Sequence, residues 1–191
     1  MNDVVVGYST TFTVDKDNRI VAIRDVVTPL HSGGKLRSAF GYQLDIPVTA
    51  VKDVKIENGS STAGLEKNQD KAVVILFDDI EQAVARGPVS VEIELDGSLS
   101  MDKVTRKSLY NPFICVSDKG FVPGAVRKEI HLTNYPPTSL ADPYPFGRND
   151  DKSSLDKAGN PIGPYYYATS ELYPFAIDLP VTDYRLSLIH I

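Results

Sequence analysis

The sequence predicts a mainly β domain: an antiparallel β-sandwich or jelly roll with one short helix and a long C-terminal loop region rich in Pro, Gly and Tyr. Hydrophobic residues recur with a period of two along much of the chain, which is typical of half-buried strands. Gly, Pro, Asn and Asp separate these segments and supply turn chemistry. The repeated crossover helices that a βαβ fold requires do not occur. At 191 residues, the chain is long enough for one large domain with a substantial core.

A long hairpin is expected at the N-terminal end. Between residues 4 and 14, Val and aromatic side chains alternate with Gly, Ser and Thr. The run Asp15-Lys16-Asp17-Asn18 follows, and residues 19–27 form the expected returning strand. Because Asp and Asn side chains bond their own backbone, we interpret this run as a turn rather than a cation site.

Five further strands and one helix are expected before the composition changes. The strands are predicted at residues 40–46, 51–56, 72–77, 89–95 and 126–132. Residues 72–77 are apolar at every position, which indicates a central strand covered on both faces. Asp79 is expected to cap a helix over residues 80–86, with Gln82 in the capping-box position and Gly87-Pro88 ending the helix.

The apolar member of each alternation is expected to face the core. Glu92 and Lys128 are expected on the solvent side of their strands. The predicted core consists of Val6, Tyr8, Phe12, Phe40, Leu44, Val74, Leu76, Val91, Ile93, Phe113, Ile130 and Phe175.

Composition excludes several classes of protein. The net charge is −5 and no cluster of Lys or Arg offsets it, so a nucleic-acid partner is not expected. The single cysteine, Cys115, rules out an internal disulfide and lies in an apolar run, where a buried thiol is expected. The longest apolar stretch, residues 72–77, is too short to span a membrane, and no signal peptide opens the chain.

No catalytic signature is present, so we expect a protein that is not an enzyme. The sequence lacks the common nucleophile-elbow, zinc-protease and phosphate-loop motifs. Cys115 with His131 would be a nucleophile–base pair, but the apolar setting of the thiol disfavours it. Glu92 and Glu94 share one strand face and could form a carboxylate pair, but a solvated strand face explains them better.

Aromatic residues gather in the region that starts near residue 134. The candidate ligand-binding residues are Tyr135, Tyr144, Phe146, Tyr165, Tyr166 and Tyr167. They lie beside Asp150 and Asp151, and aromatic faces near carboxylates suit a sugar ring or a peptide. Packing of a long irregular segment on its own aromatics is the alternative interpretation for each of them.

An ordered series of motifs resembles the signature of the LruC-domain family. The motifs are Asn111-Pro112-Phe113-Ile114, Glu129-Ile130-His131-Leu132, Tyr135-Pro136-Pro137-Thr138, Phe146-Gly147 with Asp150-Asp151, Tyr165-Tyr166-Tyr167, and Leu172 to Ile177. The resemblance runs from Asn2 to about Tyr184. It implies a bacterial cell-envelope, outer-surface or extracellular protein, often a lipoprotein, with no established biochemical activity.

Three departures from the family pattern affect the expected sites. The family's acidic loop, which would suit Ca²⁺, is represented only by Asn2 and Asp3, so tight metal binding by this fragment is not expected although the resemblance implies Ca²⁺ in the full-length protein. Asp15, Asp17, Asp150 and Asp151 are the next metal candidates. Phe175 stands where the pattern more often has Trp, which keeps a stacking face but loses an N–H donor. Residues 186–191 do not continue the pattern and are interpreted as a non-native tail on one domain of residues 1–185, with a native final strand as the alternative.

Together these features favour a non-catalytic, surface-exposed or exported β-sandwich that acts in adhesion, matrix or envelope assembly. Its partner would be a surface glycan or an envelope or matrix protein. The alternative is a carbohydrate-binding or carbohydrate-active jelly roll.

Overall fold

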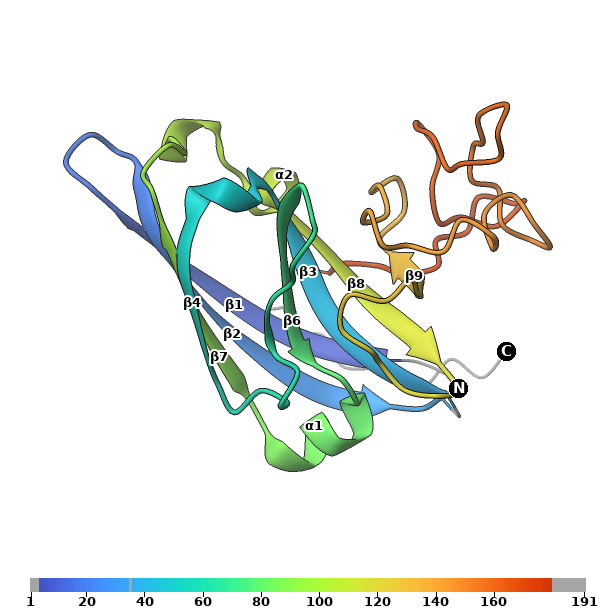
Figure 1. The fold of residues 1–191 in the computed structure, drawn as a ribbon, viewed down its shortest axis with the longest axis horizontal. Helices are drawn as coiled ribbons and strands as arrows, with labels where there is room; N and C mark the ends of the chain where they lie inside the picture. The colour runs from blue at the N-terminus through green and yellow to red at the C-terminus, as the bar shows by residue number, and fades with distance from the viewer. Residues whose placement is uncertain (1–3, 35, 180–191) are drawn as a thin grey trace.

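Two antiparallel sheets pack face to face in the computed structural model, which describes residues 4–34 and 36–179 (Figure 1). The first sheet has the order β1-β2-β7-β4, and the second has the order β5-β6-β3-β8-β9. The first comprises β1 (Val4–Val14), β2 (Ile20–Ser32), β7 (Val89–Leu95) and β4 (Val51–Glu57). The second comprises β5 (Gly64–Leu65), β6 (Lys71–Phe77), β3 (Arg37–Pro47), β8 (Tyr110–Ser117) and β9 (Lys128–His131). The predicted β-sandwich class is confirmed.

The predicted helix is α1 (Ile80–Arg86), and its ends follow the sequence signals. The Asp79 side chain accepts hydrogen bonds from the backbone N–H groups of Glu81 and Gln82. Gly87 ends the helix with a φ of 92°, a value that a residue with a side chain rarely adopts.

A second helix, α2 (Arg106–Leu109), was not predicted. It is a single turn, capped by reciprocal bonds between Thr105 and Ser108, and is too short to show a helical period. Single 3₁₀ turns occur at Val48–Ala50 and Met101–Lys103.

The main core lies between the sheets, and strand β6 contributes side chains to hydrophobic clusters on both faces of the second sheet. Val74 and Leu76 point into the space between the sheets, whereas Val73 and Ile75 pack with Phe113 in a smaller cluster on the opposite face of the second sheet. The all-apolar segment 72–77 is therefore covered on both faces, as predicted. Seven of the predicted core residues are buried: Phe40, Leu44, Val74, Leu76, Val91, Ile93 and Phe113.

Two predicted core residues are exposed, and three are only half-buried. Tyr8 is 37% exposed because β1 is the edge strand of its sheet. Phe175 is 41% exposed and lies outside the sandwich, so the prediction that it belongs to the core was wrong. Val6, Phe12 and Ile130 are half-buried, while Glu92 and Lys128 face solvent as expected.

The burial pattern expected for residues 126–132 is reversed in the structure. Glu129 and His131 are buried, whereas Val126 is 67% exposed. The neighbouring strand β8, which was not predicted as a strand, aligns His131 with Phe113 and Glu129 with Cys115 on the face that carries the smaller cluster. Mutual hydrogen bonding among polar side chains makes this inverted pattern possible, as described below.

Residues 132–179 form the predicted loop region, here called the C-terminal loop region, which extends beyond β9 (orange to red in Figure 1). Its only β contacts in the described part are isolated bridges such as Asp151–Thr169 and Ala168–Pro174. Within residues 4–34 and 36–179, no helix is long and apolar enough to cross a membrane. Asn2, Asp3 and residues 186–191 lie outside the described residues.

Candidate functional site

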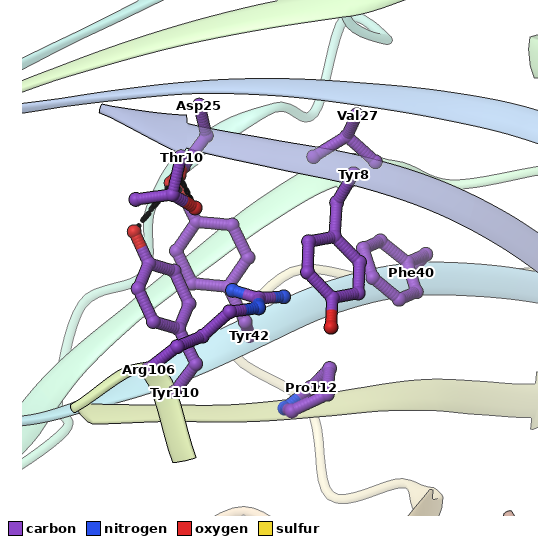
Figure 2. Close-up of a pocket in the computed structure, with 9 residues that line it drawn as sticks. All are labelled: Tyr8, Thr10, Asp25, Val27, Phe40, Tyr42, Arg106, Tyr110 and Pro112. Carbon is purple, nitrogen blue, oxygen red and sulfur yellow. Dashed lines mark hydrogen bonds between the residues drawn. The ribbon is translucent and has the colours of Figure 1, made fainter. Parts of the chain in front are cut away.

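A buried carboxylate links the two sheets across the core. Asp25 on β2 is 2% exposed and accepts hydrogen bonds from the hydroxyl of Thr10 on β1 at 2.6 Å and of Tyr42 on β3 at 2.7 Å. The hydroxyl of Tyr110 on β8 donates to both carboxylate oxygens, at 2.8 and 2.9 Å (Figure 2). Tyr42 and Tyr110 come from the opposite sheet. We call these four residues the Asp25 cluster.

An arginine lies beside the Asp25 cluster, between aromatic rings. The Arg106 guanidinium carbon is 3.2 Å from the Tyr8 ring centroid and 4.5 Å from that of Tyr110. Its Nε and Nη1 atoms are buried and have no hydrogen-bond partner in the described part of the chain. Stacking on aromatic faces holds the cation in place. Tyr8 in turn donates its hydroxyl proton to Asp178 of the C-terminal loop region.

The space between these residues is too small for an organic ligand. The void that they line has a volume of about 10 Å³, which is room for about one water molecule. Burial and the Asp25 carboxylate raise the pKa of Tyr42 and of Tyr110, so both hydroxyls remain protonated donors. The Asp25 cluster is therefore built to join the sheets rather than to bind a substrate.

A second buried polar cluster lies on the outer face of the second sheet. Arg127 donates from Nη1 and Nη2 to the two carboxylate oxygens of Glu66, at 2.5 and 2.8 Å, and from Nε to Glu129 at 2.8 Å. The Nε2 atom of His131 lies 2.9 Å from the other carboxylate oxygen of Glu129. We call Glu66, Arg127, Glu129 and His131 the ionic cluster. Their side chains are almost fully buried.

The ionic cluster binds the C-terminal loop region directly. Glu129 accepts from the backbone N–H of Thr138 at 3.0 Å and from its hydroxyl at 2.7 Å. Each carboxylate oxygen of Glu129 thus faces one donor from the Arg127–His131 segment and one from the loop region. Ser139 donates to Gln69, whose amide donates to Glu66, which attaches the loop region at a second point.

The ring of His131 is fixed by both of its nitrogens and both of its faces. Nδ1 lies 2.7 Å from Oδ1 of Asn111, whose amide group is oriented by its donation to the Pro136 carbonyl. Because Nε2 faces a carboxylate, the ring satisfies both acceptors only when both nitrogens carry protons. In that form the four charges of the ionic cluster sum to zero. Phe113 and Tyr167 stack on the two faces, with centroids at 4.8 and 5.0 Å.

The surroundings lower the pKa values of both Glu129 and His131. Burial raises the pKa of Glu129, but the hydrogen bond from His131 and the charges of His131 and Arg127 outweigh it, so the carboxyl titrates below its ordinary value. Burial lowers the pKa of His131 below its ordinary value, and the Glu129 carboxylate opposes that shift without reversing it. Burial raises the pKa of the Cys115 thiol, which leaves it protonated and unreactive.

The six candidate aromatic residues do not form one face. Phe146 and Tyr167 are buried, with Tyr167 between His131 and Phe146. Tyr144 is 65% exposed and packs under Arg148, and Tyr165 is also exposed. The other two, Tyr135 and Tyr166, are half-buried. Packing explains the buried pair, and the exposed pair remains accessible to a ligand.

Three of the four carboxylates considered as second-choice metal ligands accept local hydrogen bonds. Asp150 accepts from the backbone N–H and the hydroxyl of Ser170, which lowers its pKa. Asp151 accepts from the Gly147 N–H and from Ser153. Asp15 accepts from the backbone of Asp17 and Arg19, as in the predicted turn. Within the described ranges, no three or more His, Cys, Asp or Glu residues are grouped as a metal site.

A family model described as Domain of unknown function (DUF4842) matches residues 18–187. The match includes the strands from β2 onwards, both buried clusters except Thr10, and the C-terminal loop region. No curated protein matches the chain.

Replacing Asp25 with Ala should lower the free energy of unfolding by about 3 kcal/mol, because the buried Tyr42 and Tyr110 hydroxyls lose their shared acceptor. Urea unfolding followed by circular dichroism measures the change. The control is Asp53→Ala, at an exposed residue on β4, which should change stability by less than about 0.5 kcal/mol. Equal effects of the two substitutions would contradict the assigned role of Asp25.

Replacing Glu129 with Gln should destabilise the domain by about 3 kcal/mol near neutral pH, because the buried Arg127 charge loses one of its two carboxylate partners and Thr138 and His131 lose a charged acceptor. The pKa of Glu129 is lowered on folding, so its contribution is complete above the unfolded value of about 4.3 and is lost as pH falls through the folded value. The stability difference between the two proteins should therefore shrink on acidification. The exposed control Glu92→Gln should show neither effect, and a pH-independent difference would refute the assignment.

Proposed function

The chain belongs to the DUF4842 family, and we propose that it is a non-catalytic, extracytoplasmic binding module that acts in adhesion, matrix or envelope assembly. The observation that carries this proposal is the distribution of exposed apolar side chains. More than half of the large apolar residues exposed in the described part of the chain belong to the C-terminal loop region. They are Tyr144, Leu155, Ile162, Tyr165, Leu172, Tyr173, Phe175, Ile177 and Leu179.

Such a concentration of apolar surface is typical of a contact site. Tyr144, Leu172 and Tyr173 are each at least 64% exposed. The outer face of the first sheet instead presents charged side chains such as Arg24, Glu92 and Glu94. A partner would therefore gain most by covering the loop region, where aromatic rings supply large contact areas at low cost in conformational entropy.

The surroundings of the side chains that could act in catalysis support the non-catalytic part of this proposal. Cys115 and His131 are both buried on the outer face of the second sheet, where burial raises the pKa of the thiol and His131 is bonded through both nitrogens. Glu92 and Glu94 are exposed on β7, with Glu92 aligned between Arg24 and Lys55 of the neighbouring strands. These features favour structural and solvated roles for the residues that could otherwise act as nucleophile, base or acid.

The envelope or extracellular location and the support of the fold by Ca²⁺ in the full-length protein belong to the same proposal. They follow from the resemblance to the LruC-domain family, in which an acidic loop precedes the first strand. Asn2 and Asp3 would contribute oxygen ligands to that loop, and Ca²⁺ takes six to eight such ligands. A Ca²⁺ ion held there would stiffen the start of β1.

A carbohydrate-binding role is the second candidate, and a hollow in the C-terminal loop region favours it. The hollow has a volume of about 750 Å³, within the usual range for small-molecule sites. Tyr165 and Leu172 provide apolar lining, and Asn149, Lys152 and Ser154 add polar groups. A ring that stacks on Tyr165 could hydrogen-bond to these neighbours, as sugars do on aromatic platforms.

The double substitution Tyr144→Ala and Tyr173→Ala should weaken binding to the partner at least tenfold, because two exposed aromatic anchors are lost. The measurement is adhesion of the immobilised chain to purified bacterial envelope polysaccharide, envelope protein and matrix protein. Val84→Ala, at an exposed residue on α1, is the matched control and should leave binding unchanged. Binding that survives the double substitution would exclude this surface.

Replacing Tyr165 with Ala separates the sugar-binding candidate from general adhesion. If the hollow binds sugars, a glycan array should show specific ligands whose affinity falls at least tenfold in this variant. The substitution removes the exposed aromatic ring on which the sugar would stack and does not disturb the buried clusters. Retained glycan binding would exclude the hollow as the site. Release of shorter sugars from a bound glycan would overturn the non-catalytic assignment.

A further inference from the structure

The hollow in the C-terminal loop region is framed by two segments of the chain that pair through their backbones. The N–H group of Lys152 donates to the Ala168 carbonyl at 2.8 Å, and that of Ser154 donates to the Tyr165 carbonyl at 3.0 Å. Lys152, Ser154 and Tyr165 all line the hollow. Its lining therefore stands on a hydrogen-bonded frame, which is what a precise binding site requires.

This frame is attached to the buried part of the domain. Ser153, between Lys152 and Ser154, is only 6% exposed, and its hydroxyl accepts from the backbone N–H of Tyr167 at 3.1 Å. The Tyr167 ring in turn stacks on His131 of the ionic cluster. A site fixed in this way costs a ligand little ordering of the chain when it binds.

The carboxylates at the hollow are already engaged by donors of the protein itself. One oxygen of Asp151 accepts from the Gly147 N–H at 2.6 Å, and the other accepts from the Ser153 hydroxyl at 2.9 Å. Asp150 accepts from both the N–H and the hydroxyl of Ser170, which also lines the hollow. A ligand that offers only hydrogen-bond donors would therefore compete with these internal bonds.

The ammonium group of Lys152 is in the opposite situation. Lys152 is an exposed residue of the lining, and within residues 4–34 and 36–179 no ion pair joins its Nζ atom to a carboxylate. The Asn149 amide and the Ser154 hydroxyl add neutral donors beside it. The groups left to a ligand are thus mainly donors, one of them charged, and they favour a ligand that carries an anionic acceptor.

We propose that the hollow binds a sugar unit that carries a single carboxylate, such as a uronic acid at the end of a glycan. The face of the sugar ring would stack on Tyr165, which is 53% exposed, and its carboxylate would pair with the Lys152 ammonium. The inference rests on the carbohydrate-binding role given above as the second candidate function, and it specifies the class of sugar.

The negative charge of the protein limits how acidic this ligand is. The chain has a net charge of −5, and the carboxylates of Asp150 and Asp151 lie beside the hollow even though they are hydrogen-bonded. A polymer with a carboxylate on every unit would be repelled by these charges along most of its length. A glycan with one terminal acidic unit gains the pair with Lys152 and avoids most of that repulsion.

The test compares two disaccharides that differ only at the terminal unit, which is glucuronic acid in one and glucose in the other. Each is titrated into the full chain, and binding is followed by NMR chemical shifts. The acidic disaccharide should bind about fivefold more tightly, which corresponds to about 1 kcal/mol for a partly exposed ion pair. High salt should reduce this preference, because it screens the pair.

Substitutions assign the preference to the lysine of the hollow. Lys152→Gln should lower the affinity for the acidic disaccharide to that of the neutral one, whereas the backbone bond of residue 152 is kept. Lys157→Gln is the matched control, at an exposed lysine of the same region that does not line the hollow, and it should retain the preference. Tyr165→Ala should weaken the binding of both disaccharides, because both would stack on its ring.

The possible failures separate this inference from the role on which it rests. Equal affinities in the unaltered chain, a preference for glucose, or a preference that survives Lys152→Gln would overturn the acidic-sugar proposal and leave carbohydrate binding intact. Shifts with neither disaccharide at any concentration would overturn both.

Discussion

The carboxylate of Glu129 is the group on which the position of the C-terminal loop region depends. It accepts from Arg127, just before β9, from His131 on β9, and twice from Thr138 in the loop region. The loop region contains few regular backbone ladders of its own, so it is held by such side-chain contacts together with the backbone hydrogen bonds of Arg127 with Leu140 and Asp142. The inverted burial of β9, the stacking of Tyr167 on His131 and the exposure of the outer aromatics all follow from this anchor.

Two buried polar clusters thus organise three layers. Asp25 joins the first sheet to the second through tyrosine hydroxyls, and Glu129 joins the second sheet to the loop region. Burying a carboxylate costs free energy, and hydrophobic packing alone can give comparable stability. What the polar clusters add is direction, because each carboxylate accepts bonds only from donors placed at defined positions. This constraint would serve the proposed binding role, in which the loop region presents its exposed aromatic groups in one arrangement.

Secondary structure could be predicted from the sequence where hydrophobic residues follow a regular period and local turn or capping residues mark the ends. The sequence predicted the first hairpin, the fully buried β6 and helix α1 with Asp79 as its cap. It failed on β9 because apolar periodicity assigns Glu129 and His131 to solvent, whereas their mutual bonds allow burial. The burial of Asp25 could have been predicted, because it lies two positions from each of the buried residues Ile23 and Val27 and therefore on the same face of β2. Contacts such as Glu66 with Arg127 join distant segments, and no local pattern encodes them.

The contacts of Glu129 fold the C-terminal loop region onto the sandwich as one unit with the second sheet. Hydrogen exchange of the unaltered chain, followed by mass spectrometry, can test this arrangement. The N–H groups of Thr138, Lys152 and Ser154 are bonded to Glu129, Ala168 and Tyr165, respectively. Peptides that contain these amides should be protected at a level close to that of β8 and β9. Exchange of the loop-region peptides within seconds, while β8 remained protected for hours, would show that the region is not anchored to the second sheet.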